Sequence, residues 1–212
     1  MRSFTLISVL VLGFAAAPTP ADASGVRMFV RHEVADYATW RKAYEGFDAT
    51  RRTMGVTAQA VYRSAENPND VTATHDFKTV DKAKAFAVSA QLKTAMQSAG
   101  VKGPPQIWFT TGTPGRSGKA SHLRMYIRHE VADYAAWRKA YDGFAATQKK
   151  MGVTAQAVYQ STDQPNDVTI YHDFTTLEQA KAFTASSELK TAMENAGVKG
   201  APQIWYTTGA TK

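Results

Sequence analysis

The sequence contains no cysteine. This absence excludes disulfide bonds, thiol nucleophiles and cysteine-ligated metals, so the fold must depend on its core. Apart from one N-terminal segment, no apolar run approaches the ~20 residues that a membrane-spanning helix needs. The sequence also lacks the glycine patterns of nucleotide-binding loops and the nucleophile elbow of hydrolases. NTPase, dinucleotide-binding and hydrolase functions therefore have no support.

The net charge of +7 forms no basic stripe with residues that could read bases. We interpret the charge as solvated surface and expect no nucleic-acid partner.

The N-terminal segment has the three parts of a secretory signal peptide. A positive start is followed by an apolar run from Phe4 to Ala17 and by the small-x-small signal Ala21-Asp22-Ala23. We expect a signal peptide over residues 1–23 and a mature chain that begins near Ser24. The location is then periplasmic or secreted, with no membrane contact after cleavage.

Most of the remaining chain is one segment repeated at an offset of 97 residues. Residues 28–112 align without a gap with residues 125–209, and 59 of these 85 positions are identical. A repeat of this kind indicates a tandem duplication in which each copy is a structural unit. We predict two repeats, at 24–112 and 125–212, joined by a flexible Gly- and Ser-containing linker at 113–124.

Hydrophobic patterns predict the same six elements in each copy. In the first copy these are strands at 28–34, 57–63, 71–77 and 105–111, and helical segments at about 36–53 and 79–100, with Ser89 expected to begin a new helical turn in the second segment. The β-α-β-β-α-β order is the split βαβ pattern of ferredoxin-like folds, which belong to the α+β class. Because helices cover only one face of such a sheet, we expect the two open faces to pack together as an intramolecular pseudo-dimer. Further oligomerisation stays open.

Three segments of the first copy carry a resemblance: RHEVADYATWRKAY, GVTAQAVYRSAENPNDVTATHDF and LKTAMQSAGVKGPPQIWF. They resemble the dimeric α/β-barrel superfamily, and more narrowly its small cyclase and antibiotic-biosynthesis-monooxygenase-like members. The resemblance implies two ferredoxin-like repeats packed sheet to sheet as a barrel, here fused in one chain. It does not select one activity, because the superfamily includes oxygenases, isomerases, haem-degrading enzymes and proteins without known activity.

Four of the five histidines are duplicated, His32 as His129 and His75 as His172. Alternation places them on the helix-covered face of two strands that are neighbours in the implied fold. We therefore expect the two imidazoles of each copy to lie side by side. Such a pair in an apolar cleft can act as catalytic base and hydrogen-bonding partner, because burial keeps at least one of them neutral. The alternative is a pair of structural histidines in a filled core.

Aromatic residues on the first helix supply candidate pocket walls. Tyr44 and Phe47 are expected to be core residues. Trp40 and Tyr37, one and two turns earlier, carry an N–H and an O–H that need a hydrogen-bond partner when buried. This favours a position in the wall of a cleft. The predicted substrate-binding residues are Tyr37, Trp40, Tyr134 and Trp137.

Side chains on the opposite strand face are expected to meet between the copies. Trp108 and Trp205 are predicted to lie at this seam. Arg31 and Glu33, repeated in the second copy, are predicted to form symmetric ion pairs across it.

We expect no metal and no cofactor. Two histidines without a third convergent His, Asp or Glu make a poor zinc or iron site. The helical segment 79–100 contains no histidine, although the resemblance implies a haem ligand there in haem-degrading members.

Two functions remain after this step. The first is a cofactor-independent monooxygenase or cyclase acting on a small aromatic or polyketide-like molecule. The second is a non-catalytic periplasmic protein that binds such a small-molecule ligand. Haem binding or degradation has less support than either.

Overall fold

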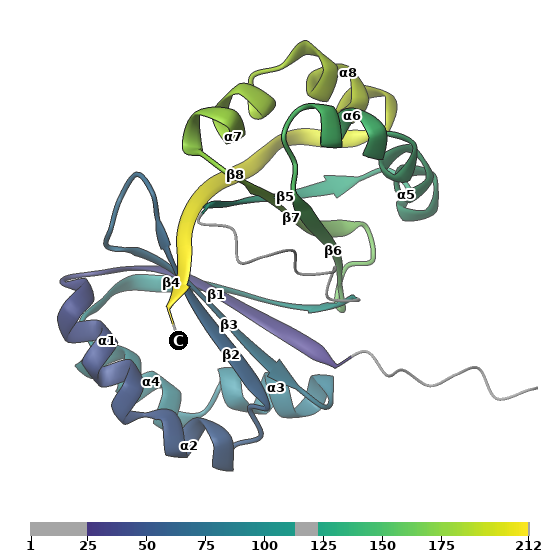
Figure 1. Cartoon of the computed structure of the whole chain (residues 1–212). Helices are drawn as coiled ribbons and strands as arrows, with labels where there is room; N and C mark the ends of the chain where they lie inside the picture. Colours follow the sequence, from purple (N-terminus) through teal and green to yellow (C-terminus); the bar gives the residue numbers. More distant parts are fainter. Residues whose placement is uncertain (1–24, 113–122, 212) are drawn as a thin grey trace, which may run out of the picture.

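The computed structural model describes residues 25–112 and 123–211 (Figure 1). The predicted signal peptide and most of the predicted linker lie outside these residues. The first copy contains β1 (Val26–Val34), α1 (Tyr37–Gly46), α2 (Asp48–Thr53), β2 (Ala58–Ser64), β3 (Asp70–Phe77), α3 (Val80–Ala87), α4 (Ala90–Ser98) and β4 (Val101–Thr111). The second copy contains β5 (Leu123–Val131), α5 (Tyr134–Gly143), α6 (Ala145–Lys150), β6 (Ala155–Ser161), β7 (Asp167–Phe174), α7 (Leu177–Thr184), α8 (Ser187–Asn195) and β8 (Val198–Thr211). None of these helices is long and apolar enough to cross a membrane.

The sequence signals at helix ends are present in the structure. The Asp36 carboxylate accepts a hydrogen bond of 2.8 Å from the backbone N–H of Thr39 and so caps α1. Gly55 follows α2 with a φ of 99°, the left-handed conformation that glycine adopts at low cost. The first predicted helical segment is nevertheless two helices, whereas the new turn expected at Ser89 is confirmed as the start of a separate helix. Phe47 separates α1 from α2, and Ser89 caps the separate helix α4.

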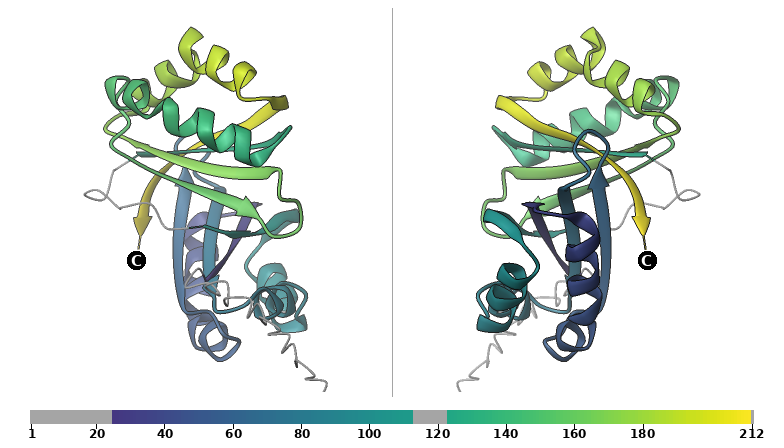
Figure 2. Two further views of the ribbon diagram at one scale, coloured as in Figure 1. Left: turned by 90° about the vertical axis from the view of Figure 1, so that its right-hand side faces the viewer. Right: turned by 90° about the vertical axis from the view of Figure 1, so that its left-hand side faces the viewer.

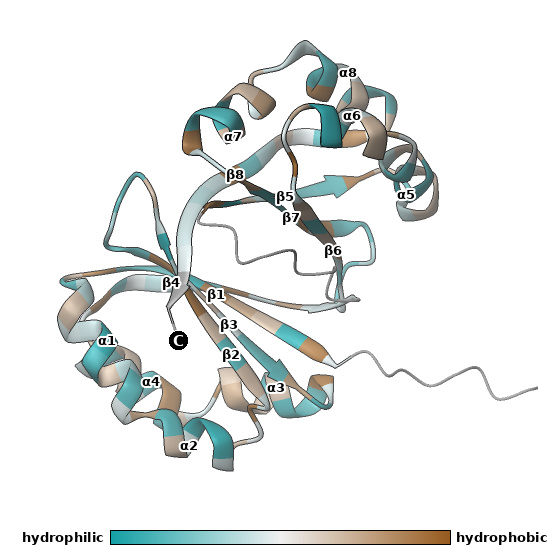
Figure 3. Cartoon of the chain, viewed as in Figure 1, coloured by the Kyte–Doolittle hydropathy of each residue, from teal (hydrophilic) through white to brown (hydrophobic). Residues whose placement is uncertain are grey.

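The eight strands form one closed barrel in the order β1-β3-β2-β8-β5-β7-β6-β4. The helices lie outside it, against the outer face of each half (Figure 2). Along each helix hydrophilic and hydrophobic residues alternate, as expected for a helix lying on a sheet (Figure 3). The predicted fold class, two ferredoxin-like repeats forming an intramolecular α/β barrel, is therefore confirmed.

Strand pairing between the copies closes the barrel. The long strand β8, drawn in yellow in Figure 1, leaves its own sheet and pairs with β2, where Ser64 lies opposite Thr207. The equivalent pair on the other side joins β4 to β6, with Thr110 opposite Ser161. These pairs leave neither sheet with a free edge at the seam, which removes a site for aggregation.

Aromatic side chains fill the interior of the barrel. Trp108 and Trp205, predicted at the seam, pack edge to face with ring centroids 6.2 Å apart. Each indole donates a hydrogen bond to a threonine of the other copy, Trp108 to Thr169 at 2.9 Å and Trp205 to Thr72 at 3.0 Å. The aromatic residues of this interior cluster are Phe29, Tyr62, Trp108, Tyr126, Tyr159, Tyr171 and Trp205.

Arginines at the ends of this cluster also join the copies. Arg124 forms a bidentate ion pair with Asp173 of its own copy. It also donates a 2.9 Å hydrogen bond to the Tyr62 hydroxyl of the other copy. Arg27 makes the equivalent contacts with Asp76 and Tyr159. Although burial opposes the charge, the hydrogen bonds to the aspartates raise the pKa of both arginines.

The predicted ion pairs across the seam are wrong. Arg31 pairs with Asp70 of its own copy at 2.6 Å, because these residues lie on adjacent strands, and its guanidinium stacks on Trp205 of the other copy at 4.8 Å. Glu33 pairs with Lys102 on the surface of the same copy. Ion pairs between the copies do occur, Lys84 with Asp163 and Lys181 with Glu66. These are about half exposed, where such pairs contribute ~0–1 kcal/mol.

We predict that Asp173→Ala destabilises the protein more than Asp76→Ala. The Asp173 side chain is 5% exposed and that of Asp76 is 27% exposed. Removing Asp173 leaves a buried guanidinium without its counter-charge, which costs about 3–5 kcal/mol. Water can replace part of the lost interaction at Arg27. Urea unfolding of both variants checks this, and equal losses in the two would contradict it.

Candidate functional site

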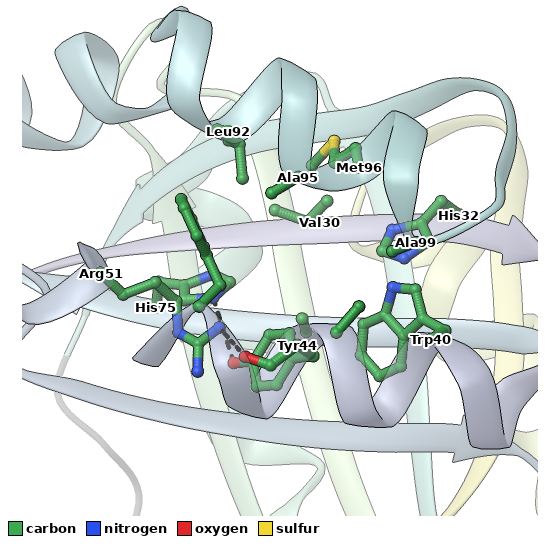
Figure 4. Close-up of a pocket in the computed structure, with 13 residues that line it drawn as sticks. Val30, His32, Trp40, Tyr44, Arg51, His75, Leu92, Ala95, Met96 and Ala99 are labelled. Carbon is green, nitrogen blue, oxygen red and sulfur yellow. Dashed lines mark hydrogen bonds between the residues drawn. The ribbon is translucent and has the colours of Figure 1, made fainter. Parts of the chain in front are cut away.

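Each copy has a small pocket between its sheet and its helices. In the first copy its residues come from the strands β1 and β3 and from the helical segments α1, α2 and α4 (Figure 4). Its lining residues are Val30, His32, Trp40, Ala43, Tyr44, Phe47, Arg51, Ala73, His75, Leu92, Ala95, Met96 and Ala99. The thirteen equivalent residues line the pocket of the second copy.

Both predicted histidines of each copy line its pocket, but they are not side by side. In the first copy His32 lies opposite Val71, and His75 lies opposite Met28. The two histidines are therefore offset by four positions along the strands, although alternation gives them the same face. The expectation of directly opposed imidazoles is wrong because the residue pattern determines the face of a side chain but not the register between strands.

A bulge in β4 marks the position of His32. Arg31 pairs with Gln106, but Glu33 pairs with Lys102, so three residues of β4 (Gly-Pro-Pro) lie opposite His32 alone. The first of them, Gly103, has a φ of 65°. The second copy has the same shift at His129. Bulges of this kind occur next to functional sites, where they change the direction of a side chain.

His75 is held by a residue that the sequence analysis assigned to the core. The Tyr44 hydroxyl lies 3.2 Å from His75 Nε2, and Tyr141 lies 3.0 Å from His172 Nε2. Burial raises the pKa of Tyr44 to about 12, so its hydroxyl stays protonated at neutral pH. Tyr44 can therefore donate to a neutral imidazole, which makes it the hydrogen-bonding partner of His75.

Burial keeps all four histidines neutral. It lowers the pKa of His32 and His129 to about 4, and that of His75 and His172 to about 3. Among the described residues, neither ring nitrogen of His32 or His129 has a hydrogen-bond partner. A buried polar group without a partner costs free energy, so in a native protein it calls for an explanation such as a bound ligand.

Of the four aromatic residues predicted to bind substrate, the two tryptophans line the pockets and the two tyrosines do not. Trp40 lines the first pocket and Trp137 the second, and the His32 ring is tilted against that of Trp40, with ring centroids 5.6 Å apart. Tyr37 lies outside the lining, 5.8 Å from Trp40, where the Arg63 guanidinium covers its ring. Tyr134 has the same place in the second copy. Tyr44 and Phe47, which were assigned to the core, line the pocket together with Trp40.

Arg51 is a pocket residue that the sequence analysis missed. Its side chain is 2% exposed, and its guanidinium lies 3.7 Å from the Tyr44 ring centroid. It donates hydrogen bonds to Gln59 Oε1, to the backbone carbonyl of Tyr44 and to Asp48. An Arg-Arg pair on a helix is usually exposed, so only the difference from Gln148 in the second copy could have indicated a role.

The pockets are small. The cavity volume of each pocket is about 40 Å³. The space without atoms, counted out through the open mouth, is about 440 Å³ in the first copy and 420 Å³ in the second. Bound drug-sized molecules need ~300–1,000 Å³. About 40 Å³ is room for a few water molecules, so even a single aromatic ring requires the pocket wall to move. Met96 is the adaptable part of that wall.

Residues 25–112 and 123–211 contain no group of three or more His, Asp or Glu side chains arranged to hold a metal. Neither α3 nor α4 contains a histidine that could ligate haem.

The sequence matches no family model and no curated protein. Solved structures are similar in fold. An anthrone oxidase-like protein gives a TM-score of 0.64 at 10% identity, over 87% of this chain and 90% of that one. A candidate monooxygenase from Lactobacillus acidophilus gives 0.56 at 12% identity, over 87% and 93%. A candidate chlorite dismutase gives 0.58 at 10% identity, over 87% and 94%.

These likenesses show the fold. The chain has the dimeric α/β-barrel architecture that the sequence resemblance predicted, with both halves in one polypeptide. Sequence identities this low leave the chemistry to the site itself.

We predict acid unfolding driven by the buried histidines. The unfolded chain binds protons at histidine near pH 6.5, whereas the folded chain resists them until about pH 3–4. Stability is therefore lost progressively as the pH falls from about 6.5 towards 3. Removing one such group by His172→Gln should move the acid midpoint to lower pH, as followed by tryptophan fluorescence. An unchanged midpoint would show that His172 does not contribute.

Proposed function

We propose that the chain is a cofactor-independent monooxygenase-like protein that acts on a small aromatic molecule in its two pockets. One observation carries this proposal. In each copy a buried histidine has both ring nitrogens unpaired among the described residues and faces an apolar, aromatic pocket. The similarity of the fold to monooxygenase-type and anthrone oxidase-like structures supports the same reaction class.

His32 is the proposed base, and the Tyr44–His75 pair is the proposed hydrogen-bonding group. A histidine with a pKa of about 4 is neutral at physiological pH and can accept a proton. It is a weak base, so the substrate must form a conjugated, stabilised anion, as hydroxyaromatic compounds do. Reaction of that anion with dioxygen then requires a pocket that excludes water, which the apolar lining provides.

The alternative proposal is a binding protein without catalysis. The same unpaired histidine nitrogens can accept a hydrogen bond from a phenolic ligand. The small volume of the pocket and the weak basicity of His32 are consistent with this function. Oxygen consumption distinguishes the two proposals, because a binding protein is stabilised by the ligand but consumes no oxygen.

The test is the double variant His32→Gln, His129→Gln, assayed with a panel of hydroxyaromatic compounds. We expect oxygen uptake by the parent and a loss of about 10²–10⁴-fold in the variant, the usual contribution of a general base. The matched control is Tyr37→Phe, Tyr134→Phe, which changes the same helix one turn outside the pocket and should keep activity. If no compound raises the melting temperature of the parent and the histidine variant unfolds, the histidines are structural and the proposal fails.

We also propose that the protein is exported and acts in the periplasm or outside the cell. The support is the tripartite N-terminal sequence, which ends in Ala21-Asp22-Ala23. N-terminal sequencing of protein recovered from the producing cells should give a start near Ser24. An intact Met1 would disprove the proposal.

A further inference from the structure

The two pockets are a matched pair with one difference in charge. Of the thirteen lining positions, ten are identical between the copies. Two of the differences are aliphatic, Val30 against Ile127 and Ala73 against Ile170. The third is Arg51 against Gln148. Both pockets nevertheless retain the same free space of about 40 Å³, so size is maintained while charge changes.

Several contacts accompany the change from Arg51 to Gln148. In the first copy Asp48 accepts from Arg51 and from Gln59, and Gln59 in turn accepts from Arg51 at 2.6 Å. This network holds the guanidinium at the end of the pocket beneath His75 (Figure 4). In the second copy Ala145 replaces Asp48, so the acidic partner disappears together with the arginine.

The hydrogen bonding at the end of the second pocket is correspondingly different. With no arginine present, Gln156 Oε1 accepts from the Tyr141 hydroxyl at 3.1 Å. Gln148 is 2% exposed, and its Oε1 has no hydrogen-bond partner among the described residues. The second pocket therefore ends in a neutral amide with an unused acceptor.

Arg51 retains capacity to bind an anion. A guanidinium has five N–H donors, and the hydrogen bonds that Arg51 makes within the described residues use three. Within the described part of the chain its one ion pair, with Asp48, is 3.2 Å long, and that carboxylate is shared with Arg52. Buried guanidinium groups bind carboxylates and other planar oxyanions well, because the geometry is fixed and water is excluded.

We infer that the two pockets bind ligands of different charge: the first takes an aromatic anion, such as an arenecarboxylate or phenolate, and the second takes a neutral aromatic molecule. The inference rests on the proposed function, because it assumes that both pockets are ligand sites. In the first pocket the anion lies against the Arg51 guanidinium. In the second a neutral ligand with an O–H or N–H donor satisfies the Gln148 oxygen.

The test uses benzoate and benzamide, two single-ring probes of the same shape that differ in charge at neutral pH. Calorimetric titration gives the stoichiometry, and the ring-proton NMR signals of His75 and His172 report which pocket is occupied. We expect one benzoate site per chain, at His75, weakened by at least about tenfold in the double variant Asp48→Ala, Arg51→Gln. That variant carries the residues of the second copy, so its pocket has a precedent in the same fold.

The reciprocal variant Ala145→Asp, Gln148→Arg should gain a second benzoate site at His172, and it keeps the test decisive if the first variant folds poorly. Benzamide binding at His172 should be strong in the parent and reduced in this reciprocal variant. Equal binding of both probes to both pockets, unaffected by the exchanges, would overturn the inference and leave the proposed function standing. Binding of neither probe to the folded parent would overturn both.

Discussion

The structure depends on hydrogen bonds that each copy can complete only with the other. The indoles of Trp108 and Trp205 and the guanidiniums of Arg27 and Arg124 all point into the barrel, and each donates to a hydroxyl group of the opposite copy. Without the second sheet these donors would lie on an exposed aromatic surface. Once buried, an unsatisfied donor costs about 1–3 kcal/mol, so the closed barrel is the arrangement that pairs them. The two copies therefore share one set of interior hydrogen bonds.

Because side chains fill the inner faces of the two sheets, the free space of the two pockets lies elsewhere among the described residues. The barrel interior is filled with stacked rings and is closed at the seam by strand pairs between the copies. The free space is instead on the outer faces, where short helices lie over the strands. Arg51 on α2 reaches the end of the pocket because it continues the spacing of Tyr44 and Phe47 along the face that the helices turn towards the sheet.

Much of the architecture could be predicted from sequence because it depends on periodicity. Alternation correctly separated Trp108, which faces the interior, from His32 and His75, which face the helices. Register does not follow from alternation, and the four-position offset between the histidines depends on which backbone groups pair. The burial of Arg51 was not predicted either. It results from stacking of the guanidinium on Tyr44 and from its hydrogen bonds to Asp48 and Gln59, and the sequence pattern does not indicate these contacts. Contacts between helices and strands therefore could not be predicted from the residue pattern.

Fusion of the two copies changes what substitution can do to the site. In a homodimer every substitution appears in both halves, so both pockets must keep the same chemistry. In this chain the residues that bond across the barrel are the same in both copies, namely Arg27, Tyr62, Thr72 and Trp108 with their equivalents. The difference between Arg51 and Gln148 lies on the outer helices, where it disturbs none of these bonds. One physical constraint therefore preserves the barrel, while the residues that line the pockets outside it are free to differ between the copies.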